Sequence, residues 1–171
     1  MRKILLVIDM QNDFIDGALG TEEAQAIVPN VKSVIENFDG DVYFTRDTHG
    51  EDYLNTQEGK NLPVPHCIKG SDGWQISSLL DTSVASEIID KPTFGYLPIA
   101  DIIAEKGSDI SEITLIGLCT DICVVSNAMI LKAKLPESNI SVIASACAGV
   151  TPQSHLDALN TMRMCQIKII E

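Results

Sequence analysis

The chain has 171 residues, 45% of them hydrophobic and only 5% aromatic, which suits one domain with a substantial core. Its 24 acidic residues outnumber its 12 basic ones, and the formal charge of −12 argues against a nucleic-acid backbone or an anionic membrane surface as partner. No apolar run is long enough to cross a bilayer, and five cysteines without a disulfide-type spacing indicate a reducing compartment, so we expect a cytoplasmic protein.

The first third of the chain predicts a β-α-β unit. Residues 3–8 (KILLVI) form an apolar run typical of a buried strand, and Asp9 follows at its carboxyl end. Thr21 predicts the N-cap of a helix with an apolar stripe at helical spacing, in which Pro29 predicts a kink or a later start. Residues 41–45 (DVYFT) predict the second strand.

A long stretch without periodicity, residues 46–74, follows the second strand. Loops of this length are usually functional or disordered. This one carries two of the three histidines of the chain and several carboxylates, namely Asp47, His49, Glu51, Asp52, Glu58 and His66. Composition alone leaves two interpretations open, a solvated polar loop and a metal site.

The middle of the chain predicts three short elements. Residues 75–80 favour a short helix, and residues 87–90 (EIID) a short strand that delivers Lys91 at its end. Residues 97–106 then predict a helix that Gly107 closes.

The most informative stretch is the strand-to-helix junction that follows. Residues 113–117 are typical of a buried parallel strand, and Thr120 or Asp121 can N-cap the apolar run at residues 122–135. Cys123 is therefore expected in the first helical turn, where free N–H groups and the helix dipole favour a thiolate. A nucleophile would be placed here, although a buried structural cysteine is the commoner interpretation of such a stretch alone.

Three further elements complete the chain: a strand at residues 140–144, a helix from Thr151 and Pro152 to about Met164, and a strand at residues 166–170. Strands that alternate with helices over the whole length predict an α/β fold. We expect three α/β/α layers with an open, mostly parallel sheet of about six strands.

Asp9, Lys91 and Cys123 would then share the carboxyl edge of this sheet, where such sheets bind ligands. Their chemistry is compatible, because a carboxylate can take the thiol proton and an ammonium can hold the thiolate and the acid in register. The thiolate can then attack a carbonyl carbon.

These residues and their neighbours resemble the isochorismatase-like cysteine hydrolases, and within them the nicotinamidases. The segment DMQNDF is similar to the family's general-base motif, with Asp9 as the base, and GLCTDICV to its nucleophile motif, with Cys123 as the nucleophile. Lys91 matches the family's lysine. The resemblance spans nearly the whole chain and implies an isochorismatase-like hydrolase fold, with residues 1–171 as a single domain.

The resemblance also implies how the substrate is held. A cis peptide between Leu118 and Cys119 would turn the backbone N–H groups of Cys119 and Cys123 toward the substrate oxygen and form an oxyanion hole. Leu118 and Phe14 would contact the substrate. Many nicotinamidases have a tryptophan before their Pro-His-Cys segment where this chain has residues 62–64 (LPV), so a second ring contact is sought among Phe94, Tyr96 and Trp74.

The long loop resembles the metal site of the nicotinamidase branch. Asp47 and His49 match its D-x-H pair, His66 matches its Pro-His-Cys histidine, and Glu58 lies where some members have a fourth ligand. Two histidines with carboxylates suit zinc, with iron or manganese as alternatives. In the family the metal receives the pyridine nitrogen of the substrate.

The leading hypothesis is an amidohydrolase that converts nicotinamide or a similar small amide to acid and ammonia through a thioester on Cys123, in a homo-oligomer without nucleic-acid or membrane partners. Two alternatives remain: a family hydrolase of another small amide or carbamoyl compound, and a binding module without turnover. The intact Asp9, Lys91 and Cys123 argue against the binding module.

Overall fold

A computed structural model describes residues 2–105 and 109–171 of the chain. One sheet runs through it, in the strand order β3-β2-β1-β4-β5-β6, and every pairing between these strands is parallel. The strands are β1 (Arg2–Ile8), β2 (Asp41–Asp47), β3 (Ala85–Lys91), β4 (Ile110–Leu118), β5 (Asn139–Ala148) and β6 (Lys168–Ile170). The predicted α/β fold with an open parallel sheet is confirmed.

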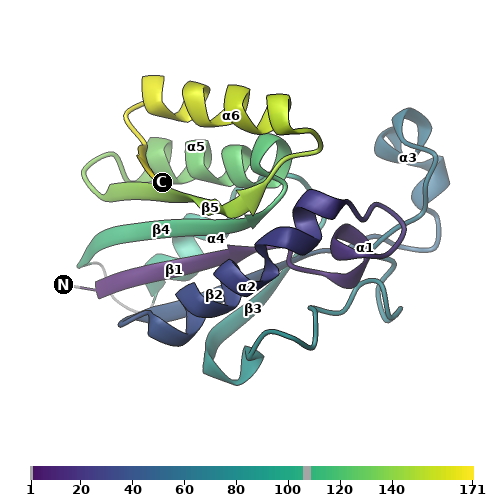
Figure 1. The fold of residues 1–171 in the computed structure, drawn as a ribbon, viewed down its shortest axis with the longest axis horizontal. Helices are drawn as coiled ribbons and strands as arrows, with labels where there is room; N and C mark the ends of the chain where they lie inside the picture. The colour runs from purple at the N-terminus through teal and green to yellow at the C-terminus, as the bar shows by residue number, and fades with distance from the viewer. Residues whose placement is uncertain (1, 106–108) are drawn as a thin grey trace.

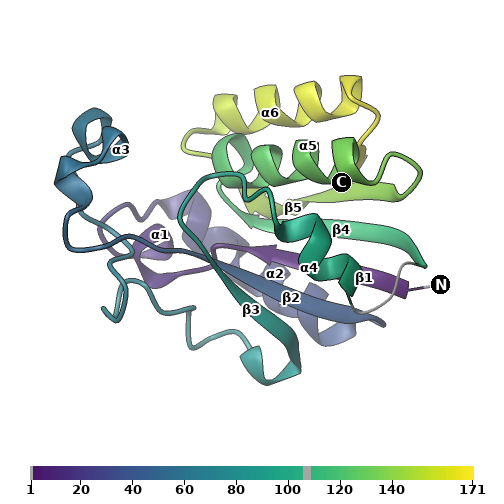
Figure 2. The ribbon, with the colours of Figure 1, turned by 180° about the vertical axis from the view of Figure 1, so that it is seen from behind.

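Helices cover both faces of this sheet. Helix α2 packs on one face, in front of the sheet in Figure 1, whereas α4 lies on the opposite face, in front in Figure 2, with α5 and α6 completing that layer. The helices are α1 (Asn12–Ile15), α2 (Glu22–Asn37), α3 (Gln57–Asn61), α4 (Ile99–Glu105), α5 (Val125–Lys134) and α6 (Pro152–Met164). No helix in residues 2–105 and 109–171 has the length and apolarity that a membrane span requires.

The central strand β1 shows why the strands of this sheet are continuous apolar runs in the sequence. Leu5 and Val7 belong to the core under α2, whereas Ile4, Leu6 and Ile8 belong to the core under α4, α5 and α6. Successive side chains of a strand point to opposite faces. Because both faces are covered by helices, each side chain must be apolar, and the polar chemistry is left to the ends of the strands.

The ends of β1 and β4 approach closely because β4 carries Gly117. This residue has φ +114°, a conformation in which side chains are strained, and a Cβ atom there would lie 2.1 Å from the carbonyl oxygen of Ile8. Asp9, the next residue of the neighbouring strand, also has a positive φ, of +46°. The backbone is therefore bent where β1 meets the turn that carries Cys123.

Several predicted boundaries differ from the structure. Residues 75–80 form no helix, since Ile76 makes an antiparallel bridge with Gln11 and the Ser77 N–H donates to the Met10 carbonyl. These tertiary hydrogen bonds replace the local ones that a helix would need. The helix predicted at residues 97–106 begins only at Ile99, and its predicted end at residues 106–107 lies outside the described residues.

The two expected irregularities have different outcomes. Pro29 lies inside α2, which runs without interruption from a Thr21 cap whose side chain accepts from the Ala24 N–H. The stretch at residues 46–74 is mostly irregular, as predicted, but it contains the end of β2, a 3₁₀ turn and α3. Elements of three to five residues are too short to show a period in the sequence.

Candidate active site

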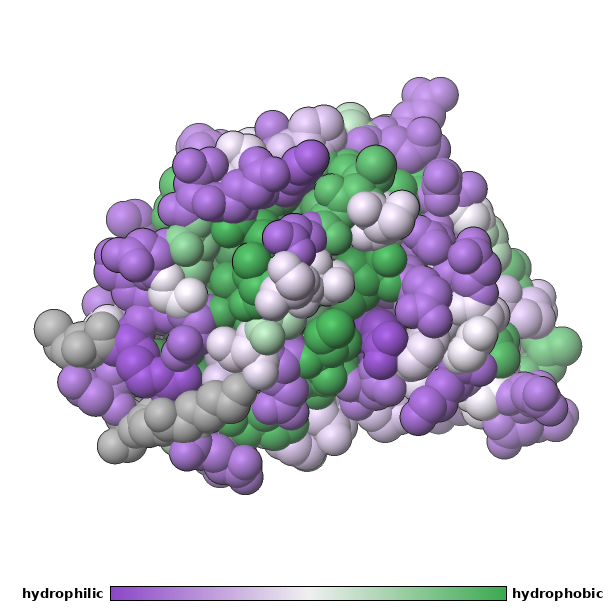
Figure 3. Space-filling view, turned by 90° about the horizontal axis from the view of Figure 1, so that it is seen from below, coloured by the Kyte–Doolittle hydropathy of each residue, from purple (hydrophilic) through white to green (hydrophobic). Residues whose placement is uncertain are grey.

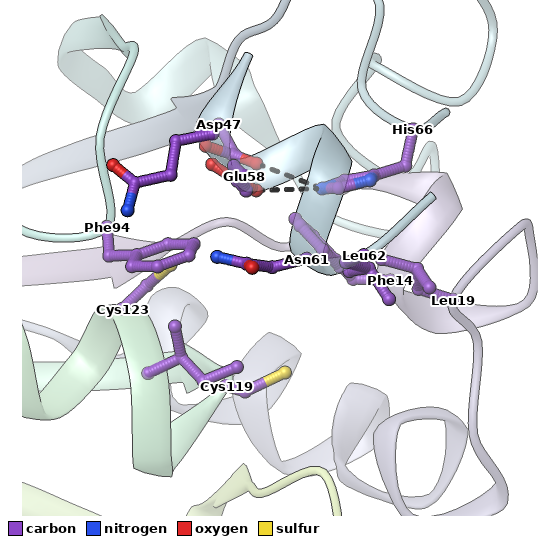
Figure 4. A pocket seen from close by; sticks show the side chains of 12 residues that line it. Phe14, Leu19, Asp47, Glu58, Asn61, Leu62, His66, Phe94, Cys119 and Cys123 are labelled. Carbon is purple, nitrogen blue, oxygen red and sulfur yellow. Dashed lines mark ion pairs between the residues drawn. The ribbon is translucent and has the colours of Figure 1, made fainter. Parts of the chain in front are cut away.

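The carboxyl edge of the sheet gathers the predicted residues around one cavity. Asp9 directly follows β1, and the paired residues Asp47 and Lys91 end β2 and β3. Cys123 lies in a π-helical turn after β4. The cavity has a volume of about 440 Å³ (Figure 4) and is lined by Phe14, Leu19, Asp47, Gln57, Glu58, Asn61, Leu62, His66, Phe94, Cys119, Ile122 and Cys123.

An ammonium group lies between the acid and the thiol. Lys91 Nζ is 2.7 Å from Asp9 Oδ2 and 3.4 Å from Cys123 Sγ, and it donates to the Thr93 carbonyl at 3.1 Å. Asp9 and Lys91 are both completely buried, so their charges are not screened by water. Thr45 Oγ donates to Asp9 Oδ1 at 2.6 Å and fixes the carboxylate. The three residues that the sequence predicts for one edge are thus in contact.

The protonation of Cys123 differs from the expectation. Burial raises the pKa of its thiol well above the usual value, and the negative charge of Asp9 raises it further, although Lys91 acts in the opposite direction. Burial likewise raises the pKa of Asp9, against the effect of Lys91. Burial and the facing carboxylate thus oppose the effect that the helix N-terminus was expected to have on this thiol. The geometry favours a thiol that loses its proton during the reaction.

The turn that carries Cys123 is also not capped as predicted. The carboxylate of Asp121 accepts from the Val150 N–H at 3.2 Å, and Thr120 Oγ lies 2.7 Å from His155 Nδ1. Both side chains therefore bind residues at or just before the start of α6, and neither caps the turn. Residue 119 precedes the turn without a side-chain cap, and the α-helix begins only at Val125. Such π-helical insertions are frequent at functional sites.

The peptide between Leu118 and Cys119 is cis, as the resemblance implies. Cys119 and Phe14 line the cavity. The Leu118 side chain does not: it is buried in the core under α2, so the predicted contact of Leu118 with a substrate falls to its backbone. Its backbone is the part next to the nucleophile turn.

Four side chains from the end of β2 and the segment that follows it form a second cluster. Asp47, His49, Glu58 and His66 each present a ligand atom, and these atoms lie within 4.8 Å of one another. His49 Nε2 is 2.8 Å from Asp47 Oδ2, and His66 Nε2 is 3.5 Å from the same oxygen and 3.7 Å from Glu58 Oε1. Glu51 and Asp52, the other carboxylates that the sequence singled out, are exposed and outside the cluster.

The cluster fits a divalent cation. His66 Nδ1 donates to the Val64 carbonyl at 2.8 Å, so Nε2 is the ring atom that faces the carboxylate oxygens and would offer its lone pair to a cation on losing its proton. Within the described residues, the buried Asp47 Oδ1 has no hydrogen-bond partner, and the Lys91 ammonium is 3.7 Å away. Burial raises the pKa of the Asp47 carboxyl, but hydrogen bonds from His49 and His66 hold it well below its usual value. Two imidazoles and ionised carboxylates are a donor set that zinc accepts.

The structure shows which of the candidate aromatic residues line the cavity. Phe94 lines the cavity together with Phe14. Trp74 does not, because its ring lies under the Arg46 guanidinium at 3.6 Å and its Nε1 donates to Thr48. Tyr96 packs partly buried against the core under α4 and α5.

Sequence reasoning missed Gln11, which anchors Asp47 of the candidate metal cluster. Its Nε2 donates to the carbonyls of Asp47 and Trp74 at 2.8 and 2.9 Å, and its Oε1 accepts from the Asp47 N–H at 2.7 Å. The only signal was a polar residue inside the DMQNDF segment, since its partners lie 36 and 63 residues away.

Comparisons with known proteins agree with this geometry. Residues 3–171 match the family model described as the isochorismatase domain. The nicotinamidase/pyrazinamidase of Mycobacterium tuberculosis is 25% identical over 188 residues, covering 98% of this chain and 98% of that protein. The crystal structure of a nicotinamidase from Bacillus subtilis matches all of both chains with a TM-score of 0.82 at 27% identity. A pyrazinamidase of Pyrococcus horikoshii, solved in complex with zinc, matches with a TM-score of 0.84 at 26% identity, covering 100% of this chain and 99% of that one.

Proposed function

The chain belongs to the isochorismatase family, and we propose that it is an amidohydrolase that converts nicotinamide or a similar small amide to acid and ammonia. The observation that carries the proposal is the Lys91 ammonium between the Asp9 carboxylate and the Cys123 sulfur at the floor of the cavity. The full-length similarity to nicotinamidases supports it. Residues 1–171 would act as one catalytic domain.

The reaction would proceed through a thioester. Asp9 takes the proton of the Cys123 thiol, Lys91 stabilises the thiolate, and the sulfur attacks the amide carbon. The backbone N–H groups of Cys119 and Cys123 would donate to the resulting oxyanion. Asp9 then gives its proton to the leaving nitrogen, and ammonia departs. Water, deprotonated by Asp9, attacks the thioester carbon and releases the carboxylic acid and the free thiol.

The cluster of Asp47, His49, Glu58 and His66 would bind a divalent metal, which we propose to be zinc with iron or manganese as alternatives. The bound metal would supply an electrophilic position for a pyridine nitrogen. The zinc complex of the pyrazinamidase from Pyrococcus horikoshii supports this assignment. On the side of this chain, Phe14 and His66, with ring centroids 5.5 Å apart, would position the ring that carries the amide.

We also propose that the enzyme is a cytoplasmic homo-oligomer. Figure 3 shows one face of the molecule on which hydrophobic residues gather in the centre, surrounded by hydrophilic ones. Large exposed apolar patches with a polar rim are typical of protein interfaces.

The function is tested with a panel of small amides assayed for ammonia release. We expect nicotinamide and pyrazinamide to be hydrolysed at least tenfold faster than a short aliphatic amide or an N-carbamoyl amino acid. Phe14, Leu19 and Phe94 give the cavity an apolar lining that suits an aromatic ring, and no lysine or arginine of the lining offers a bidentate or point contact to a substrate carboxylate. If only the N-carbamoyl amino acid releases ammonia, the substrate is a carbamoyl compound and not nicotinamide.

The metal is tested separately by elemental analysis of the purified protein. We expect close to one divalent ion per chain, and His66→Ala should lower metal affinity at least tenfold because it opens the ligand set. His155→Ala is the matched control, since this third histidine contacts Thr120 and lies outside the cluster. Chelation should stop turnover of nicotinamide while Cys123 still reacts with iodoacetamide. A metal-free protein whose activity resists chelators would rule the site out.

A further inference from the structure

A buried side-chain amide that the proposed mechanism does not use lies one helical turn after the nucleophile. Asn127, on α5, is completely buried. Its Nδ2 donates to the carbonyls of Cys123 at 2.8 Å and Phe94 at 3.0 Å, and its Oδ1 accepts from the Tyr96 N–H at 2.9 Å. This single side chain therefore ties residues 94–96 to the turn that carries the nucleophile.

The tied segment forms a wall of the active-site cavity. After β3 the chain crosses toward α5 before it enters α4 (Figure 2), and Phe94 projects into the same cavity as Cys123 (Figure 4). The Phe94 side chain is 43% exposed and belongs to neither hydrophobic core of the described residues. Since no packed core holds this ring, the anchoring of its backbone sets its position.

The approach of the segment to α5 is close. A Cβ atom on Gly95 would lie 2.7 Å from Ile130 Cδ1 and 3.0 Å from Ser126 Cβ. The segment therefore packs closely on α5, and a side chain at residue 95 would require Ile130 to change its position and would press the segment against Ser126.

We infer that Asn127 is a positioning residue that holds Phe94 as the cavity wall beside Cys123 and thereby sets the preference for ring-bearing amides. The kinetic part of this inference rests on the proposed function. Asn127 is not needed to hold the ammonium, because Lys91 Nζ has its own bonds to Asp9 and to the Thr93 carbonyl. The effect should thus fall on binding of the ring and spare the chemical step.

The test is a double-mutant cycle with Phe94. Asn127→Ala and Phe94→Ala should each raise the KM for nicotinamide about tenfold and change kcat less than threefold, and the double variant should be no worse than either single variant. Ser126→Ala, in the same turn, removes the hydroxyl that donates to the Ile122 carbonyl and should leave KM unchanged. Additive effects, or a fall in kcat at constant KM, would overturn the inference in favour of a role through Cys123 or Lys91.

Two further measurements keep the inference testable if Asn127→Ala does not fold or if the parent protein hydrolyses no ring amide. Gly95→Ala leaves Asn127 in place, crowds the same segment against Ser126, and should raise KM in the same direction. Hydrogen exchange at the Tyr96 amide needs no substrate and should accelerate at least tenfold in Asn127→Ala or Gly95→Ala. If the parent protein hydrolyses none of the amides, the proposed function is refuted. If the Tyr96 amide of the variants exchanges at the rate of the parent protein, the positioning role is refuted.

Discussion

Cys123→Ala is expected to reduce ammonia release to below a few per cent of the parent rate while the fold stays intact. The sulfur of Cys123 lies 3.4 Å from the Lys91 ammonium and faces the cavity. Alanine supplies no atom that can form the thioester, so the remaining residues can bind the amide without cleaving it. The change removes one small buried group and should lower the free energy of unfolding by only about 1 kcal/mol.

Cys147→Ala is the matched control for this prediction. Cys147 is 4% exposed and Cys123 is 5% exposed, but Cys147 lies in β5 without a contact to Lys91 in the described structure. Its variant should keep full activity, as should Cys165→Ala at the exposed end of α6. Thermal unfolding and alkylation with iodoacetamide would be measured on all three variants. Activity of Cys123→Ala above a few per cent would mean that another group is the nucleophile.

Asp9→Asn is expected to slow turnover by a factor of roughly 10² to 10⁴, the usual contribution of a positioned general base. The amide cannot take the thiol proton, although its oxygen can still accept from Thr45. The change also leaves the buried Lys91 ammonium without the carboxylate that lies 2.7 Å away. Breaking a buried ion pair in this way costs about 3 to 5 kcal/mol, so the variant should also unfold at lower temperature.

A partly exposed ion pair with the same 2.7 Å separation distinguishes the two effects. Asp90 Oδ1 is 2.7 Å from Arg46 Nε, but these side chains are 30% and 18% exposed. Asp90→Asn should therefore cost less than about 1 kcal/mol and leave the rate unchanged. Steady-state kinetics gives the turnover rate of each of the two variants, and chemical denaturation gives its free energy of unfolding. If Asp9→Asn is as active as the parent, the general base has to be sought elsewhere.

Local sequence was sufficient wherever the interacting partners are close along the chain. The Thr21 and Thr151 caps were predicted correctly because each hydroxyl accepts from a backbone N–H three residues later. Similar capping was predicted for Thr120 and Asp121 and was wrong. Their side chains bind residues 150 and 155, which no local pattern can indicate.

The sequence by itself determined the alternation of strands and helices, the residues at the strand ends and the ligand types in the loop after β2. Strands that are buried on both faces must be apolar, so their polar ends stand out in the chain. The tertiary structure alone decided that the Lys91 ammonium lies between Asp9 and Cys123, that the pKa of the Cys123 thiol is raised and that Asn127 anchors Phe94. These properties depend on burial and on charges from distant strands, and an amino-acid sequence carries that information only through the fold.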